Sequence, residues 1–153
     1  MLKLHWIEIF LRCIPEMLLI IWGIYTIAQK SFNKRNYIIL SCIMGLYSFL
    51  VRELPIYFGV HTVIITVSII SIMIIQGIPL LTSIYATLAM LLLLIISESS
   101  NKFILYISGI PFNFTNINPI KKSILTFPSL IILFLSILVL KNIVKRTDLH
   151  ILK

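Results

Sequence analysis

The sequence predicts an all-α protein, a polytopic membrane helix bundle with about five transmembrane helices. Hydrophobic residues make up 59% of its 153 residues, and charged residues only 12%, about half the charged share of an ordinary globular domain. Several apolar runs approach the roughly 17–25 residues needed to cross a bilayer. A soluble domain of this size could not bury so much apolar surface.

The first predicted helix covers Ile7 to Ala28, and Lys30 to Asn36 form a polar turn after it. The second covers Tyr37 to about Val51. Its fifteen residues would span only about 22 Å, less than a hydrocarbon core of about 30 Å. This helix therefore either ends early or continues past the charges that follow it until Pro55.

The third predicted helix runs from about Val60 to Ile75, and the sequence QGIP (76–79) separates it from a fourth that ends near Ile96. Glu98, just beyond that end, is interpreted as part of a solvated helix end. A polar, Asn-rich stretch follows. If Phe103 to Ile110 crossed the membrane, the chain would have six spans.

The fifth predicted helix covers Ser123 to Leu140 and contains Pro128. These elements predict one transmembrane helical domain, residues 1–140, followed by a short basic cytoplasmic tail, residues 141–153. The two cysteines, Cys13 and Cys42, lie inside apolar runs and form no metal-binding or redox motif. The sequence predicts no cofactor and no metal site.

The net charge of +8 does not indicate a nucleic-acid partner, because the basic residues flank apolar segments. With five spans, seven basic residues lie on one side and five or six on the other, and Lys121 and Lys122 weaken the bias. The larger group predicts an outer N-terminus and a cytoplasmic C-terminus in the cell membrane. Its members are Lys30, Lys34, Arg35, Lys141, Lys145, Arg146 and Lys153.

Charged residues inside the first helix form the first candidate site. Glu8, Arg12 and Glu16 recur every fourth residue, so they share one helix face, and Arg12 can reach either carboxylate. Each charge near the centre of a span costs about 2.5–3.5 kcal/mol on insertion scales. Pro15 adds a kink and an unpaired carbonyl. The pattern indicates a polar binding site, a structural ion pair or a helix half at the interface.

The stretch RELPIYFGVHT forms the second candidate site and places five notable residues close together: Arg52, Glu53, Pro55, Gly59 and His61. Proline disfavours helical geometry in the residue before it, glycine permits a turn or a close helix approach, and histidine titrates near neutral pH. One interpretation is a re-entrant or broken turn whose two charged residues and histidine point inward to bind a ligand. The alternative is an ordinary extracellular turn with snorkelling charges.

The block from Arg52 to Thr62 resembles the pattern R-x-L-P-I-x-F-G-x-H-T of the N-terminal membrane module of GHKL-type sensor histidine kinases from spore-forming Firmicutes. Lesser similarities to that module are an early glutamate (Glu8 or Glu16), a Ser-Glu pair (Ser97, Glu98) and an Asn-Pro entry to the fifth helix (Asn118, Pro119). After Leu140 only thirteen residues remain, too few for a kinase domain. The resemblance implies a stand-alone sensor module and assigns no catalytic residue.

The sequence thus favours a non-enzymatic membrane sensor or regulatory module that binds a small ligand or peptide, or senses the membrane state. Its partners would be the lipid bilayer and either a membrane or cytoplasmic signalling protein or a second copy of the chain. The alternative is a small transporter or transporter subunit that uses intramembrane carboxylates such as Glu16. An intramembrane peptidase is disfavoured, because neither cysteine has a histidine at a suggestive spacing and H-E-x-x-H is absent.

Overall fold

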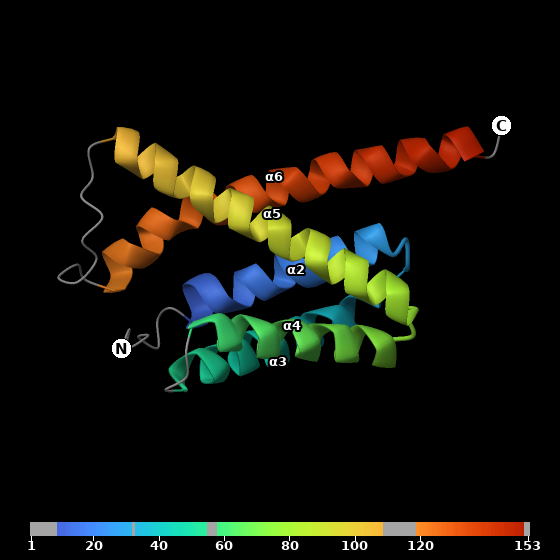
Figure 1. Cartoon of the computed structure of the whole chain (residues 1–153), viewed down its shortest axis with the longest axis horizontal. Helices are drawn as coiled ribbons and strands as arrows, with labels where there is room; N and C mark the ends of the chain where they lie inside the picture. Colours follow the sequence, from blue (N-terminus) through green and yellow to red (C-terminus); the bar gives the residue numbers. More distant parts are fainter. Residues whose placement is uncertain (1–8, 32, 55–57, 109–118, 152–153) are drawn as a thin grey trace.

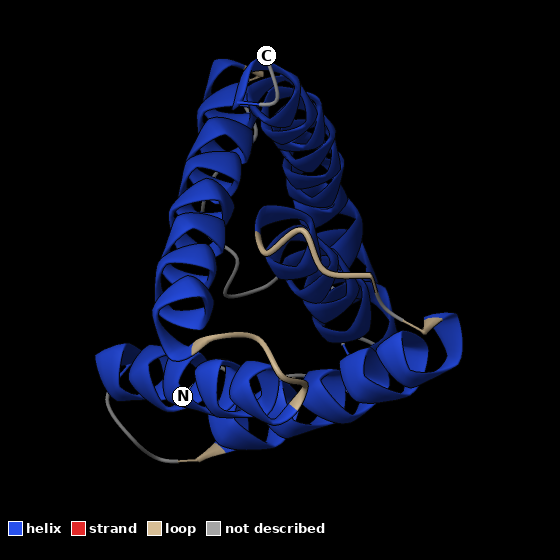
Figure 2. Cartoon of the chain, turned by 90° about the vertical axis from the view of Figure 1, so that its right-hand side faces the viewer, coloured by secondary structure: helices blue, strands red, loops and turns tan. Residues whose placement is uncertain are grey.

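The computed structural model describes residues 9–31, 33–54, 58–108 and 119–151, and these contain helices and turns but no strand (Figure 2). The prediction of an all-helical protein is confirmed. The elements are a π-helical turn η1 (Ile9–Cys13) and the α-helices α2 (Ile14–Ile27), α3 (Lys34–Glu53), α4 (Phe58–Ile75), α5 (Leu80–Ile107) and α6 (Pro119–Ile151).

Helix α2 lies at the centre of the bundle, where it contacts α3, α5 and α6. Helix α4 packs against α3 and α5. Consecutive helices run in opposite directions, and α2 lies between the α3–α4 pair and the α5–α6 pair (Figure 1). The beginnings of α2, α4 and α6 therefore share one end of the bundle with the last residues of α3 and α5.

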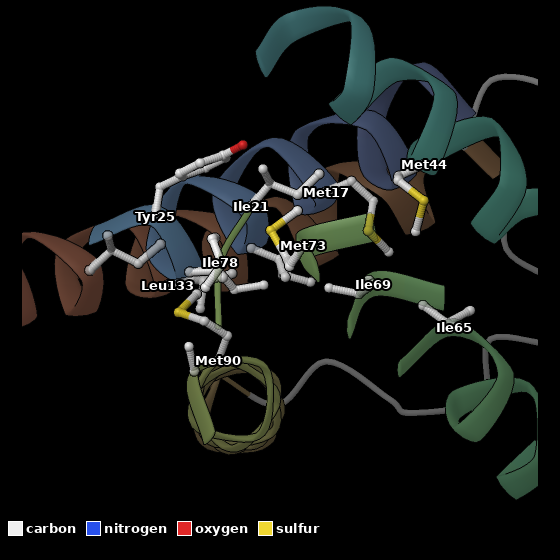
Figure 3. Packing of buried hydrophobic residues seen from close by; sticks show 14 of the residues in the cluster. Met17, Ile21, Tyr25, Met44, Ile65, Ile69, Met73, Ile78, Met90 and Leu133 are labelled. Carbon is white, nitrogen blue, oxygen red and sulfur yellow. The ribbon is translucent and has the colours of Figure 1, made fainter. Parts of the chain in front are cut away.

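The core is formed by isoleucine, methionine and leucine side chains that α2 shares with its neighbours (Figure 3). Ile21 of α2, Met73 of α4, Met90 of α5 and Leu133 of α6 are all fully buried. Helix α2 supplies buried residues at Met17, Ile20, Ile21 and Ile24, a spacing that covers one broad helix face. This face holds the other helices around α2.

Much of the remaining apolar surface is exposed. Two segments are long and apolar enough to cross a membrane, α5 and Leu125–Lys145 of α6, yet only 28% and 22% of their apolar windows are buried in the bundle. Leu81 and Leu92 of α5 are 78% and 61% exposed. A soluble core helix would be mostly buried, and exposed apolar surface on this scale marks an interaction with lipid or protein. These two helices indicate membrane association.

Of the two alternatives that the sequence left open for the second helix, continuation through the charges is the one observed, and α3 also begins earlier than predicted. Its 20 residues span about 30 Å. The helix starts at Lys34, after the N-cap Asn33, whose side chain accepts a hydrogen bond from the Arg35 N–H at 3.2 Å. At its other end it continues through Arg52 and Glu53. It lies very close to the start of α2 at Gly45, where an added Cβ would lie 2.9 Å from Ile14 Cγ1. The charges did not end the helix, since Arg52 has a partner within the bundle.

The break that QGIP predicts between α4 and α5 is confirmed. Gly77 adopts a positive φ of 78°, and the Ile78 N–H donates to the Met73 carbonyl at 3.0 Å, as in a glycine-terminated helix end. Lys30 Nζ donates to the carbonyls of Gln76 and Gly77 at 2.7 and 2.8 Å. The turn after α2 is thereby fixed to the end of α4.

The predicted end of the fourth helix near Ile96 is wrong, because α5 continues to Ile107. Residues Phe103 to Ile107 therefore belong to α5 rather than to a separate span. The helix persists through polar residues because their side chains have partners: Ser97 donates to the Ser129 carbonyl and Asn101 Nδ2 to the Leu125 carbonyl at 3.0 Å. Helix α6 is also longer than predicted and includes residues 141–151.

Replacing Gly45 tests the close approach of α2 and α3. We expect Gly45→Val to lower the unfolding free energy by about 1–3 kcal/mol, since the new side chain would overlap the Ile14 backbone and side chain. The measurement is thermal or denaturant unfolding of the purified protein in detergent. Gly59→Ala is the matched control, because nothing lies within 4 Å of a Cβ at Gly59. Equal stability of the two variants would contradict the close approach.

Candidate functional site

Four charged side chains, one each from η1, α2, α3 and α5, form a connected ion-pair network, called here the Glu16 network: Arg12, Glu16, Arg52 and Glu98. Glu16 is its centre, with 2% of its side chain exposed. Arg52 Nη2 donates to Glu16 Oε1 at 2.9 Å, and Arg12 Nε lies 3.8 Å from Glu16 Oε2. Arg12 Nη2 also donates to Glu98 Oε1 at 2.6 Å. The network is neutral in sum, with two guanidinium groups and two carboxylates.

The local structure of the first helix positions Arg12 and Glu16. The irregularity that Pro15 predicts appears as the π-helical turn η1, which ends at Cys13, with Pro15 in the first turn of α2. Proline is tolerated there because the first helical N–H groups need no intrahelical partner. Cys13 keeps right-handed helical angles, so Arg12 stays one turn before Glu16 and the expected contact between them is present.

Arg52 and Glu98 reach the network from the last turn of α3 and from the later part of α5. Because consecutive helices alternate in direction, the end of α3 and this part of α5 lie beside the start of α2. We call this part of the bundle the network end. The side chains of Arg12, Arg52 and Glu98 are 26%, 27% and 32% exposed, so the network has a buried centre and a partly open rim.

The burial of Glu16 makes its partners necessary. An isolated carboxylate removed from water loses several kcal/mol of solvation even after the protein relaxes. Arg52 compensates this loss with a charge-assisted hydrogen bond to Glu16, which is stronger than a neutral hydrogen bond, and Arg12 adds a second positive charge at 3.8 Å. Such a pair is costly to break from one side, and the network therefore ties α2 to α3 and, through Arg12, to α5.

The structure separates the predicted residues of the second site. His61, in the first turn of α4, is 9% exposed, and its Nε2 donates to the Leu54 carbonyl at 3.0 Å. His61 thus points inward as expected. Arg52 also points inward, but toward Glu16. Glu53 is exposed, so the expectation that it points inward is wrong.

Two further expectations concern backbone residues near the turn. Gly59 is exposed and approaches no other helix, so of the two roles that its sequence allowed, a turn or a close helix approach, the close approach is absent. Pro55 and Glu8 lie outside the described residues. Helix α3 ends at Glu53 and α4 begins at Phe58, and residues 55–57 of the turn considered from the sequence also lie outside the described residues.

Sequence reasoning missed Glu98, which was interpreted as a solvated helix end. The structure instead pairs it with Arg12. The order of the helices could have indicated this pair. In a bundle of alternating helices the end of the fourth helix lies at the level of Arg12, and Arg12 and Glu98 carry opposite charges that can compensate each other. The α5–α6 contact also contains the buried oxygen Asn101 Oδ1, which has no hydrogen-bond partner among the described atoms.

Comparison with known proteins adds no relative. No protein-family model matches the chain, and neither a curated protein nor a solved structure matches it significantly. Among the described side chains, no group of three or more His, Cys, Asp or Glu residues is placed to hold a metal ion. The Glu16 network is therefore the candidate functional site.

Removing Arg52 tests the network. We expect Arg52→Gln to lower the unfolding free energy by about 2–4 kcal/mol, because it leaves the buried Glu16 with Arg12 alone. Glu98→Gln, which breaks a more exposed pair, should cost about 1 kcal/mol or less. The measurement is denaturant unfolding in detergent micelles.

A double-mutant cycle separates pairing from other effects of the substitution. Arg52→Gln combined with Glu16→Gln should destabilise the protein by clearly less than the sum of the two single variants, since the double variant buries no unpaired charge. Strict additivity of the two substitutions would show that Arg52 and Glu16 do not interact.

Proposed function

We propose that the protein is a non-enzymatic integral membrane sensor or regulatory module, in which a small ligand, a peptide or a change in the membrane state acts on the Glu16 network. In this proposal all five helices cross the membrane. The N-terminus and the network end face outward, and residues 141–153 are cytoplasmic. The resemblance of Arg52–Thr62 to a sensor-kinase membrane module supports this proposal, and the proposed output is to a membrane or cytoplasmic signalling partner.

The observation that carries the proposal is the position of the buried Glu16 between two arginines at one end of the bundle. Arg52 belongs to the distinctive Arg52–Thr62 block, and it connects the end of α3 to α2. His61, from the same block, hydrogen-bonds to the carbonyl of Leu54, the residue directly after α3. A ligand with a negatively charged group would compete with the carboxylates of the network for the partly exposed guanidinium of Arg52 or Arg12. Such competition would shift the equilibrium between two helix packings. The shift in free energy is at most the difference between the ligand's binding free energies for the two packings.

A path from the network to the tail runs along α2. The Trp22 ring stacks on Phe134 of α6, with ring centroids 5.6 Å apart, and Lys141 Nζ lies 6.0 Å above the Trp22 ring. Lys141 is the first residue of the last part of α6, which ends at Ile151. A displacement of α2 at Glu16 would therefore reach the segment proposed to contact a signalling partner.

The buried carboxylate of Glu16 also favours a second candidate, a small transporter or transporter subunit, because intramembrane carboxylates serve as proton or substrate sites. Its two arginine partners weigh against this candidate. A carboxylate that releases and binds protons during transport needs a partner that can leave, whereas a guanidinium keeps its charge in proteins. The network therefore fits a switch in helix packing better than a proton relay.

The proposed topology predicts the labelling of single cysteines introduced into a Cys13→Ala, Cys42→Ser background. A membrane-impermeant maleimide added to intact cells should label Ser100→Cys, on α5 past Glu98, but not Ser31→Cys or Lys145→Cys. The latter two should react only after the membrane is opened, because both lie at the opposite end of the bundle. Labelling of all three positions from one side would contradict five alternating spans.

The sensor role is tested in the source cell by deleting the gene and restoring it as wild type or variant. Wild type should restore a limited set of transcripts, and Arg52→Lys and His61→Ala should fail to restore them while the protein accumulates normally in the membrane. Lys102→Gln is the control, an exposed residue of α5 outside the network. Normal transcripts in both site variants, or equal loss of folded protein in both, would oppose a sensing role. Uptake of a solute that depends on Glu16 would instead favour transport.

A further inference from the structure

The charged side chains of the bundle are divided between its two ends. At the network end lie the three carboxylates whose side chains the structure describes, Glu16, Glu53 and Glu98, together with Arg12, Arg52 and Lys102. The opposite end carries five cations whose side chains the structure describes: Lys30, Lys34, Arg35, Lys141 and Lys145. We call this second end the basic end; the sequence also places one acidic residue there, Asp148, near the end of α6. Much of the net charge of +8 is therefore uncompensated there.

Four of these five cations are available to a partner outside the chain. Lys30 is engaged within the bundle, since its ammonium group donates to the carbonyls of Gln76 and Gly77. Lys34 and Arg35 are exposed at the start of α3, and Lys141 and Lys145 are exposed on α6. The two pairs belong to the same end because α2, which precedes α3, runs in the same direction as α6 (Figure 1).

Exposed apolar side chains lie directly beside these cations. One turn after Lys34 and Arg35, Ile38 and Ile39 of α3 are 53% and 49% exposed. On α6, Val139 precedes Lys141 and is 58% exposed. The aromatic Trp22 lies under the Lys141 ammonium group, and tryptophan is enriched at the level of lipid headgroups. Cations that flank apolar helix faces in this way match a molecule with an acidic head and an apolar chain.

From this arrangement we propose that the basic end binds anionic phospholipids, with the headgroup phosphates at Lys34, Arg35, Lys141 and Lys145 and the acyl chains along α3 and α6. Anionic lipids carry a net negative charge that zwitterionic lipids lack, and basic residues near such a surface are attracted within about a Debye length. The apolar neighbours favour a lipid over free phosphate, which would contact the cations alone. This inference does not depend on the proposed sensing role.

The test is native mass spectrometry of the full-length protein in detergent, with dioleoyl phosphatidylglycerol or dioleoyl phosphatidylcholine added. Wild type should retain phosphatidylglycerol in preference to phosphatidylcholine, and the preference should weaken as ammonium acetate is raised from about 0.1 M to about 1 M. The variant Lys34→Gln, Arg35→Gln, Lys141→Gln, Lys145→Gln should bind phosphatidylglycerol about tenfold more weakly. Detergent solution removes any effect of these substitutions on membrane orientation.

Lys102→Gln is the matched control, since it removes an exposed cation from the network end and should leave lipid retention unchanged. Thermal unfolding of the fourfold variant checks that it remains folded, and each pair of substitutions is also tested alone. Wild type that retains both lipids equally, or a folded fourfold variant that retains as much phosphatidylglycerol as wild type, would overturn the proposal. So would competition by soluble glycerophosphoglycerol as strong as that by the intact lipid, because the cations would then recognise phosphate alone.

Discussion

The pairing of buried Glu16 with Arg52 and Arg12 is the interaction on which the arrangement of the helices depends. A carboxylate with 2% of its side chain exposed is stable only when compensating charges reach it, because desolvation costs more than a single weak contact returns. The two arginines come from different elements, and one of them also binds Glu98 of α5. The requirement of one side chain thus fixes the relative positions of α2, α3 and α5 at the network end.

The remainder of the bundle follows from packing around α2. The close approach at Gly45 lets α3 lie against the first turn of α2, where Arg52 can reach Glu16. The stack of Trp22 on Phe134 holds α6 against the other half of α2. Apolar residues on the outer faces of α5 and α6 remain exposed, and a hydrocarbon environment is the setting in which such faces are favourable. The same environment makes the network more costly to break than it would be in water.

The sequence was sufficient for the helical architecture and for part of the network. The length of the apolar runs and the breaks between them, QGIP among them, predict five helices, and the spacing of Arg12 and Glu16 predicts their contact. Helix ends were less predictable, because they depend on partners in other helices. Arg52, Glu98 and Asn101 resemble helix-terminating polar residues in isolation. Each is accommodated inside a helix by a contact more than twenty residues away in the sequence.

The partner of Arg52 and the exposure of Glu53 could not be assigned from adjacency alone. Neighbouring residues on a helix point about 100° apart, so knowing that one faces the interior does not decide which helix it meets. The same limit applies to His61, whose inward direction follows from the predicted turn but whose partner, the Leu54 carbonyl, depends on the geometry where α3 ends. Long-range pairing of this kind needs the fold before the site can be drawn.

The most direct measurement of the central interaction is a solid-state NMR dipolar recoupling experiment on the protein in lipid bilayers, between ¹⁵N-labelled arginine side chains and the ¹³C-labelled carboxyl group of Glu16. The account predicts strong dephasing of the Glu16 carboxyl signal, weakened in an Arg52→Gln sample, and little magnetisation transfer from water to that carboxyl. A Glu16 carboxyl that is in contact with water and shows no coupling to any guanidinium nitrogen would contradict it.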